Sequence, residues 1–560
     1  MAEPENSQSK DAAAADASAD DGATSGATGE VPDAAASQHK ASTPGFITMG
    51  ERLEKLNEAR KWVYSGGGQD KLDAQRAKGK LTARDRVAAL LDPGSFQEMN
   101  GFAKHRCIYF GMDTKELPAE GVVTGAGAVS GRLVHVASQD FTVMGGAAGE
   151  VHCDKIVEMM RNSLKTGSPF IFINDSGGAR IQEGIDSLGA YGRIFYNNVN
   201  LSGVVPQISL ICGPCAGGAA YSPALTDFII QTRHAQMFIT GPSVIKQVTG
   251  EEVTAEQLGG PEAQMHYSGV VHFVAENDRH AIEICQKLLS FLPSNNMEDP
   301  PQLPYKDTVT DNAALNRLVP DNPRAAFDMH DIITGIVDHG DFLEVQATYA
   351  QNMIVGFGRF LGRPAGIIAN NPMHKAGVLD IDSSDKASRF IRFCNAFNIP
   401  LVTLVDVPGF MPGVEQEYGG IIRHGAKMLF AYSAATVPKV TIVCRKAYGG
   451  AYLAMCAKDL GADRAAAWPT AEIAVMGAEG AAEIVFRREI AAAEDKDVRR
   501  KELIERYRET FSTPYVAAGR RMVDDIIEPA ATRRYISMAL ETLATKRELR
   551  PEKKHGLIPL

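Results

Sequence analysis

Two short glycine-containing loops are the residues of this sequence best suited to chemistry. Gly217-Gly218-Ala219 and Gly449-Gly450-Ala451 each follow a β-branched apolar run, and each opens a helical pattern. Glycine lets the backbone approach a ligand closely, and free N–H groups at a helix start favour negative charge. A lone glycine pair more often serves tight packing, but two equivalent loops favour a function. We therefore predict two loops that hold oxyanions.

The elements that must position these loops form a repeat. Apolar strands alternate with helical patterns along both halves of the chain, which indicates β-α-β crossovers. The following segments recur at an offset of 231 residues: Gly131-Arg132 as Gly362-Arg363, Asp154-Lys155 as Asp385-Lys386, and Asp175 as Asp406. Val205-Pro206 and the first glycine loop recur at an offset of 232. We predict a duplicated α/β fold, with domains at residues 44–300 and 301–560 and a Pro-rich linker at their boundary.

The N-terminal region differs from the repeated part. Residues 1–43 are Ala, Ser, Asp, Gly and Thr with almost no large apolar side chain, which predicts a disordered tail. Residues 49–91 have helical apolar spacing and are expected to form a helical lead-in. The formal net charge is -10, and the first 40 residues contribute eight acids against two lysines. Nothing in this balance favours binding to nucleic acid.

Cellular location and thiol chemistry are indicated only by composition. No apolar run approaches the roughly 20 residues that a membrane helix needs, and the N-terminus lacks a signal-peptide pattern, so we expect no membrane insertion and a cytoplasmic protein. The eight cysteines are scattered, which fits reduced structural thiols. Cys212 and Cys215 form a C-x-x-C pattern that leads directly into the first glycine loop, and we expect neither redox chemistry nor a metal site there.

Other candidate residues have simpler interpretations. Lys427 lies between Ala426 and Met428, as a biotin-accepting lysine would, but in a helical pattern, so it is expected to be part of a core helix. His374 and His424 could act as bases, but no fixed partner is visible, and structural histidines are expected. No glycine-rich nucleotide-binding motif follows a strand. An activated donor must therefore come from elsewhere.

The sequence resembles the carboxyltransferase (β) subunits of biotin-dependent acyl-CoA carboxylases, which include the propionyl-CoA and acetyl-CoA types. The resemblance covers residues 49–560. It is carried by these motifs: Ala77-Lys-Gly-Lys-Leu-Thr-Ala-Arg84, Asn174-Asp-Ser-Gly-Gly-Ala-Arg180, Gly213-Pro-Cys-Ala-Gly-Gly-Ala219, Asp406-Val-Pro-Gly-Phe410, the run from Glu417 to Lys427, and Arg445-Lys-Ala-Tyr-Gly-Gly-Ala451.

This resemblance implies a fold and an assembly. Each half should adopt a crotonase-like (ClpP/crotonase) fold, and the protein should form a ring-shaped homohexamer. Acyl-CoA would sit on the N-half of one subunit and carboxybiotin on the C-half of its neighbour. The biotin carboxylase and the biotin carboxyl carrier would lie on partner chains. Carboxybiotin would supply both the CO₂ and the base, so the protein would need only placement and oriented donors.

The resemblance also implies residue roles. Gly217 and Gly218 would hold the thioester oxygen as the enolate forms, and Gly450 with Ala451 would hold the ureido oxygen of biotin. Further substrate-binding residues would be Gly177, Gly178, Ala179, Arg180, Ala219, Tyr221 and Leu453. Further biotin-binding residues would be Gly449 and Tyr418. No metal is expected.

The acyl group and the physiological direction are less constrained. The propionyl-CoA type has Asp where this chain has Leu453, which puts the chain-length preference in doubt. The segment from Tyr452 to Gly480 looks more like the methylmalonyl-CoA:pyruvate transcarboxylase subunit and the methylmalonyl-CoA decarboxylase α subunit. We expect propionyl-CoA/methylmalonyl-CoA as substrates, with acetyl-CoA as an alternative. Two other functions are a crotonase-type hydratase or hydrolase that uses Glu183, and a non-catalytic CoA-binding assembly subunit.

Overall fold

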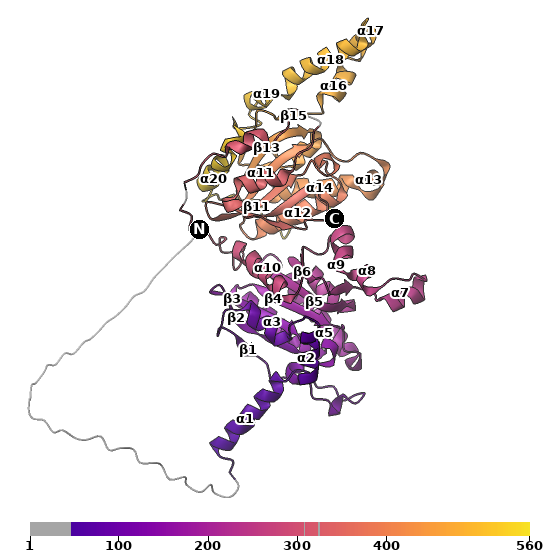
Figure 1. Ribbon diagram of the computed structural model, residues 1–560, viewed down its shortest axis with the longest axis vertical. Coiled ribbons are helices and arrows are strands. Elements are labelled where there is room, and N and C mark those ends of the chain that lie inside the picture. The colour runs from indigo at the N-terminus through magenta and orange to yellow at the C-terminus, as the bar shows by residue number, and fades with distance from the viewer. Residues whose placement is uncertain (1–45, 307, 323–324) are drawn as a thin grey trace, which may run out of the picture. The chain divides into compact units, whose positions relative to one another are not determined.

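The computed structural model describes residues 46–306, 308–322 and 325–560, so the predicted tail at residues 1–43 lies outside the described residues. The chain divides into two compact units, Met1–Glu58 and Ala59–Leu560. Helix α1 (Met49–Tyr64) begins in the first unit. Both sheets lie in the second unit (Figure 1).

The N-half is built on one mixed sheet of eight strands among the described residues. The strand order is β1-β2-β3-β4-β5-β6-β8, and β7 pairs with β5. The first three strands are antiparallel, and the pairs from β3 onward are parallel. The strands are β1 (Gln97–Met99), β2 (Val122–Val129), β3 (Arg132–Gln139), β4 (Phe170–Ser176), β5 (Gln207–Ala216), β6 (Phe228–Thr232), β7 (Gln236–Phe238) and β8 (Phe273–Ala275).

The sheet of the C-half repeats this topology. Its order is β9-β10-β11-β12-β13-β14-β16, and β15 pairs with β13 in the same way as β7 pairs with β5. The strands are β9 (Leu343–Val345), β10 (Met353–Phe360), β11 (Arg363–Asn370), β12 (Leu401–Val407), β13 (Lys439–Tyr448), β14 (Arg464–Ala467), β15 (Glu472–Ala474) and β16 (Asp525–Ile526). The duplicated α/β fold predicted from the spacing is confirmed.

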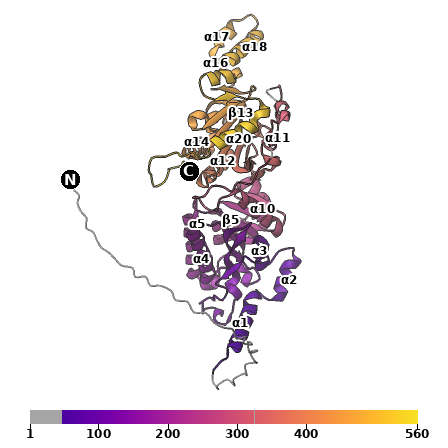
Figure 2. The ribbon, with the colours of Figure 1, turned by 90° about the vertical axis from the view of Figure 1, so that its left-hand side faces the viewer.

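Helices cover the sheets and form the connections (Figures 1 and 2). The N-half contains α2 (Gln69–Ala77), α3 (Ala83–Leu90), α4 (Glu150–Thr166), α5 (Ile185–Leu201), α6 (Tyr221–Ala224), α7 (Pro242–Thr249), α8 (Ala255–Gly259), α9 (Pro261–Ala263) and α10 (Asp278–Phe291). The C-half contains α11 (Met329–Ile336), α12 (Ile381–Ala396), α13 (Val414–Gly419), α14 (Ile421–Ala434), α15 (Gly449–Ala454), α16 (Ala478–Val485), α17 (Arg487–Ala492), α18 (Lys496–Tyr507), α19 (Pro514–Gly519) and α20 (Thr532–Thr542).

The central strands are buried on both faces. Every residue of β4 and β12 is buried, which explains why both strands are mainly apolar and lack strict alternation. Helix α4 is amphipathic and buries one face, including Ile156 and Met160, against the N-half sheet. The pattern of apolar strand followed by amphipathic helix therefore produces the layered packing.

A buried lysine occupies the same place in each half. Lys155 Nζ donates to the backbone carbonyls of Ala119 and Val122, both at 2.6 Å. Lys386 Nζ donates to the carbonyls of Gln346 and Tyr349 at 2.9 and 2.7 Å. Burial lowers the pKa of Lys155 to about 8 and that of Lys386 to about 7. The recurrent Asp-Lys pair of the sequence thus marks a repeated contact between a helix and the segment that joins the first two strands of each sheet.

The two halves of the second unit share apolar core. Phe228 of β6 packs edge-on against Phe393 of α12, with 4.6 Å between ring centroids, and also contacts Phe357 of β10. These residues belong to one continuous cluster of buried side chains. The predicted boundary at residues 300/301 falls between α10 and α11, where no strand is found in the described residues, and it stays a prediction.

In the described part of the chain, no helix combines the length and apolarity required to span a bilayer. The predicted cytoplasmic location stays a prediction.

Candidate functional site

The first glycine loop continues directly from strand β5. Gly217 opens a short 3-10 turn (η5, Gly217–Ala220), and its φ of 62° lies in the left-handed region that favours glycine. Gly218 is half-buried, and a methyl group placed on it would lie 3.7 Å from the ring of Tyr191. Helix α6 follows, and its first residue, Tyr221, is 49% exposed. The backbone of this loop therefore lies beside the aromatic ring of Tyr191.

The second glycine loop has the same construction. Gly449 has a φ of 59° and begins α15 directly after β13. The residue before it, Tyr448, makes no capping hydrogen bond through its side chain, and the first N–H groups of a helix have no partner within that helix. A methyl group on Gly450 would lie 4.0 Å from the ring of Phe410. The two loops are thus equivalent in the conformation of their first glycine and in position on the sheet. Each second glycine lies near an aromatic ring, which comes from α5 in the N-half and from the segment after β12 in the C-half.

The predicted residues after β4 lie beside the first loop. A methyl group on Gly178, whose φ is 102°, would lie 3.0 Å from the carbonyl oxygen of Ala216, which precedes Gly217. Ala179 forms an isolated parallel bridge with Ala148, and Gly177 N donates to Gly145 O at 3.0 Å. The structure therefore brings the backbone of these predicted substrate-binding residues next to the first glycine loop.

Arg180 is placed differently from a ligand-binding arginine. Its side chain is fully buried and pairs with Glu120 and with Glu183, the latter at 2.7 Å. Its Nη2 also donates to the carbonyl of Ala147 at 3.0 Å. Glu183 in turn accepts the N–H of Glu150, at the start of α4, at 2.6 Å. Both Arg180 and Glu183 are therefore committed to holding loops of the protein together.

Other predicted residues surround the second loop. Leu453 lies on α15, three residues after Gly450, and is 39% exposed. Tyr418 lies on α13 and is 89% exposed; α13 packs on α14, and α14 packs on α15. Ala451 is buried, as is Ala219 in the first loop.

The histidine and the thiols that were expected to be structural lie in surroundings typical of structural residues. His424 Nδ1 lies 2.9 Å from both carboxylate oxygens of Asp385 and 3.1 Å from Lys427 Nζ, between α12 and α14. Cys212 and Cys215 are buried and not joined by a disulfide. Burial raises the pKa of Cys215 to about 12, so its thiolate is scarce at neutral pH. Within the described residues, no cluster of His, Cys, Asp and Glu could hold a metal ion.

Two features were missed in the sequence. Phe410 bridges to Leu379 in the same way as Ala179 bridges to Ala148, so Phe410 is the C-half counterpart of the segment beside the first loop. The signal was the Asp-Val-Pro-Gly-Phe motif at the repeat offset, which had been assigned no role. The second missed feature is the set of partners of Asp175 and Asp406, two residues that the repeat did identify. Asp406 binds Arg445 of β13, whereas Asp175 binds Arg86 of α3.

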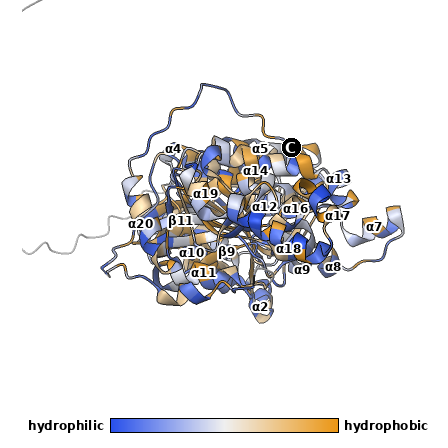
Figure 3. Ribbon diagram, turned by 90° about the horizontal axis from the view of Figure 1, so that it is seen from above, coloured by the Kyte–Doolittle hydropathy of each residue, from blue (hydrophilic) through white to orange (hydrophobic). Residues whose placement is uncertain are grey.

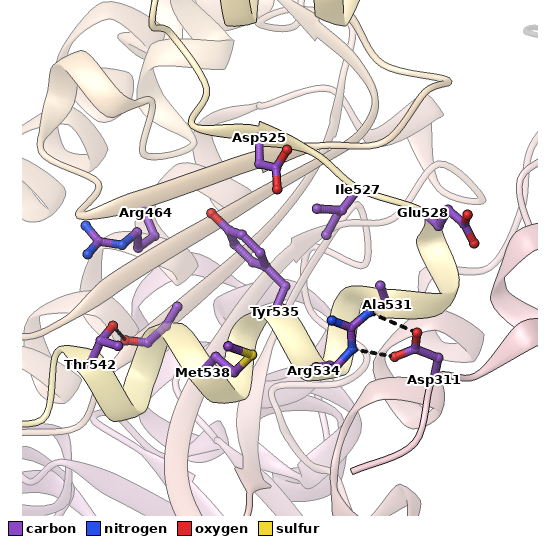
Figure 4. Close-up of a pocket in the computed structure, with 11 residues that line it drawn as sticks. Asp311, Arg464, Asp525, Ile527, Glu528, Ala531, Arg534, Tyr535, Met538 and Thr542 are labelled. Carbon is purple, nitrogen blue, oxygen red and sulfur yellow. Dashed lines mark hydrogen bonds and ion pairs between the residues drawn. The ribbon is translucent and has the colours of Figure 1, made fainter.

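Two cavities of the described chain lie away from the glycine loops. The cavity in Figure 4, about 560 Å³, lies beside α20 and is lined by Arg464, Asp525 and Tyr535, with an Arg534–Asp311 ion pair at its rim. A second cavity, of about 620 Å³, lies where α12 meets β6. None of the predicted site residues lines either cavity. Gly450 is exposed, and Gly217, Gly218 and Gly449 are partly buried.

Comparison with known proteins agrees with this geometry. Residues 74–558 match the model of the family described as carboxyl transferase domain. The chain is 61% identical over 512 residues to the methylmalonyl-CoA carboxyltransferase 12S subunit of Propionibacterium freudenreichii subsp. shermanii, covering 91% of this chain and 98% of that one. It is 58% identical over 517 residues to the methylmalonyl-CoA decarboxylase subunit alpha of Veillonella parvula, covering 92% and 100%.

A solved structure is similar throughout. The crystal structure of transcarboxylase 12S, described as a hexamer assembly with methylmalonyl-coenzyme A and methylmalonic acid bound, superposes with a TM-score of 0.91. It is 60% identical in sequence, and the match covers 92% of this chain and 99% of that chain. The resemblance predicted from the motifs, including the crotonase-like fold of both halves, is confirmed.

Proposed function

We propose, because this chain belongs to the carboxyl transferase domain family, that it moves a carboxyl group between carboxybiotin and the α-carbon of propionyl-CoA, with methylmalonyl-CoA as the carboxylated form. The choice of acyl group is supported by two similar proteins whose names refer to methylmalonyl-CoA, and by a solved relative that binds it.

One observation carries the proposal. Two loops at equivalent positions of two equivalent sheets begin with a left-handed glycine, at φ 62° and 59°, and have an aromatic ring beside their second glycine. A reaction in which two oxyanions develop needs two such loops. A hydratase or hydrolase needs one loop and an acidic side chain, and its candidate Glu183 is buried against Arg180.

In this proposal each loop holds one oxygen. The N–H groups of Gly217 and Gly218 hold the thioester oxygen, and those of Gly450 and Ala451 hold the ureido oxygen of biotin. An oriented donor of this kind lowers a barrier by about 3 to 4 kcal/mol, because its dipole is in place before charge develops. Tyr191 and Phe410 limit the access of water on one side of each loop.

Neighbouring residues shape the two sides. On the acyl side, these are the backbone of Gly177, Gly178 and Ala179 together with Ala219 and Tyr221; on the biotin side, they are Gly449 and Tyr418. We place Leu453 at the acyl group, where its apolar side chain favours a methyl branch. The buried guanidinium of Arg180 contributes by keeping the loop after β4 in position.

The loops fit biotin chemistry without a protein base. When bound, carboxybiotin supplies the carboxyl group and accepts the α-proton. The residues of this chain orient the two reactants, hold the two oxygens and keep the site dry.

We further propose a homohexamer in which the N-half of one subunit faces the C-half of its neighbour, with biotin carboxylase and biotin carrier on partner chains. The solved relative is described as a hexamer. Exposed apolar side chains support the burial of this surface in an interface between subunits. Val244 and Val248 on α7 are 47% and 76% exposed, and Figure 3 shows hydrophobic segments on this helix. The site would then be complete only in the oligomer.

The physiological direction follows from the partner chains. Carboxylation of propionyl-CoA, transcarboxylation from methylmalonyl-CoA to pyruvate and decarboxylation of methylmalonyl-CoA all use the same half-reaction. Relatives named as a methylmalonyl-CoA carboxyltransferase subunit and a methylmalonyl-CoA decarboxylase subunit match 91% and 92% of this chain. Isolating the native complex and identifying whether it contains a biotin carboxylase, a pyruvate-specific carboxyltransferase or a membrane decarboxylase subunit distinguishes the three.

The proposal is tested with the purified chain and free biotin. We expect biotin-dependent decarboxylation of methylmalonyl-CoA, measured by release of CO₂. Turnover of an acyl-CoA that does not depend on biotin would favour a hydratase or hydrolase, and binding without turnover would favour an assembly subunit. Either result would contradict the proposed function.

Gly450→Pro tests the second loop. Proline is tolerated in the first turn of a helix, so this change removes one N–H donor and leaves α15 in place. Turnover should fall at least 100-fold. Gly450→Ala keeps the N–H, and its methyl group meets nothing closer than 4.0 Å, so it should retain at least ten times the activity of the proline variant. Equal activities would exclude a role for this N–H.

A further inference from the structure

A matched irregularity interrupts the strand before each glycine loop. In the N-half, Asn174 pairs with Ile211, but Ser176 pairs with Cys215, so β5 bulges opposite Asp175. In the C-half, Val405 pairs with Val443 and Val407 with Ala447, so β13 bulges opposite Asp406. Each bulge has two extra residues and lies a few residues before Gly217 or Gly449. The path of the bulge therefore sets where each loop begins.

The C-half holds its bulge with its own residues. Arg445, within the bulge, binds Asp406 through Nε at 3.2 Å and Nη2 at 2.8 Å. The N–H of Lys446 donates to the same carboxylate at 2.9 Å. Asp406 and Arg445 are both buried. The carboxylate, its cation and its backbone donor thus come from two adjacent strands of one sheet.

The N-half lacks both of these partners. The strand register aligns Cys215 with Ala447, so Gly213 stands where the C-half has Arg445, and Pro214 where it has Lys446. Proline has no N–H to donate. Accordingly, Asp175 Oδ1 has no hydrogen-bond partner among the described residues. A side chain on Gly213 is excluded because its Cβ would lie 1.9 Å from this oxygen.

The missing cation comes from the lead-in before the sheet. Arg86 of α3 places Nη2 2.9 Å from Asp175 Oδ2 and 3.4 Å from the carbonyl of Cys212, and its Nε binds Asp278 at 2.7 Å. Lys80 Nζ adds a second contact to Asp175 at 2.8 Å. Helix α3 packs on the N-half sheet (Figure 2).

We propose that Arg86 and Lys80 are positioning residues for the acyl-side loop, acting through Asp175 on the bulge of β5. They substitute, from outside the repeated unit, for the role that Arg445 fills within the C-half. Lys80 and Arg86 of the lead-in are therefore part of the support of the acyl-CoA site, although neither side chain reaches a reacting atom. This inference rests on the proposed function, in which Gly217 and Gly218 hold the thioester oxygen.

The geometry explains why replacing Arg86 or Lys80 should weaken binding of the transition state more than binding of the substrate. Arg86 is 1% exposed and Asp175 fully buried, so the pair cannot be replaced by water. Only four residues of strand separate Cys212, whose carbonyl Arg86 binds, from Gly217. A displacement of about 1 Å in an oriented group costs about 100-fold in rate. Binding of the CoA moiety itself does not depend on the bulge.

Three variants of the full-length chain test the proposal. Arg86→Lys keeps the positive charge and removes the guanidinium group that contacts Asp175, Asp278 and the carbonyl of Cys212. Lys80→Met removes one contact to Asp175 and leaves the Arg86–Asp175 pair in place. Arg84→Met is the control, because Arg84 lies on the same helix but pairs with Glu98 at 2.9 Å. Thermal melting confirms that each variant is folded.

The readouts are affinities for two CoA ligands. One is propionyl-CoA, and the other is a CoA analogue with a nitronate, whose anionic oxygen imitates the enolate. We expect Arg86→Lys and Lys80→Met to weaken nitronate binding about 10- to 100-fold while propionyl-CoA binding changes less than about 2-fold. Arg84→Met should behave as the wild type in both.

Two results would overturn the proposal: unchanged nitronate binding in both variants, or an equal loss for both ligands with a lower melting temperature, which shows a merely structural role. These measurements need no biotin. A wild-type chain that shows the expected ligand discrimination but no biotin-dependent turnover would therefore refute the proposed function and leave the positioning role standing.

Discussion

The left-handed glycine of the first loop gives a prediction whose size follows from the structure. Gly217 has a φ of 62°, and a methyl group added to it would meet nothing closer than the carbonyl of Ile239 at 3.9 Å. Gly217→Ala therefore introduces no clash. Its cost is the left-handed conformation, about 1 to 2 kcal/mol for a residue with a Cβ. The reduced freedom of the unfolded chain offsets part of this cost.

The activity should fall much more than the stability. The strained alanine is relieved when φ returns to negative values, and that rotation turns the peptide plane that carries the N–H of Gly218. Loss of one oxyanion donor lowers kcat about 100- to 1,000-fold, which corresponds to about 3 to 4 kcal/mol. We therefore expect a melting temperature within a few degrees of wild type and a kcat lower by at least 100-fold.

The assay is biotin-dependent decarboxylation of methylmalonyl-CoA, with thermal melting followed in parallel. Gly449→Ala is the matched variant, because its φ is 59°, but its methyl group would lie 3.0 Å from the carbonyl of Val475. It should lose activity to a similar extent and lose more stability. A kcat within 10-fold of wild type for Gly217→Ala would refute the assignment of the loop as an oxyanion hole.

Three further predictions concern residues around the site. Arg180→Met should destabilise the chain by about 3 to 5 kcal/mol in denaturant unfolding, because Glu120 and Glu183 lose their buried partner. A higher KM for acyl-CoA with unchanged stability would instead indicate that Arg180 binds the ligand. An alkylating reagent should label Cys107 in the native protein and leave the seven buried cysteines unmodified until unfolding; native labelling of Cys215 with loss of activity would contradict its assignment as structural. Burial lowers the pKa of Lys386 from 10.5 to about 7, so the unfolded chain binds this proton more tightly than the folded chain. The stability contributed by this group therefore rises from about pH 7 to pH 10. The free energies of unfolding of wild type and Lys386→Met, measured in urea, should diverge over this range, and a constant difference would contradict the shift.

The duplication could be predicted from the sequence because it depends on short-range signals. The Asp-Lys pairs and glycine loops recur at nearly constant offsets, and each follows or precedes an apolar run that forms a strand or helix locally. The positions of both loops at the ends of β5 and β13 follow from the same pattern. The positions of the two loops in the fold could therefore be predicted, and the roles of their residues stay predictions.

The partners of buried charges could not be predicted in this way. Arg180 was expected to bind substrate, yet its side chain pairs with Glu120, which is 60 residues earlier in the chain. Arg86 and Asp175 are separated by 89 residues and meet only because α3 packs on the sheet. Such pairs depend on tertiary packing, and no local pattern distinguishes a buried arginine from one that faces a ligand.

The aromatic contact between the halves has a consequence for how the protein unfolds. Phe228 belongs to one repeat, and its ring lies among Phe357 and Phe393 of the other, so neither half has a complete core alone. Separating them would expose these rings to water at a cost of several kcal/mol. The two repeats should therefore melt in a single cooperative transition, and a protease cut in the linker near Pro300 should leave them associated.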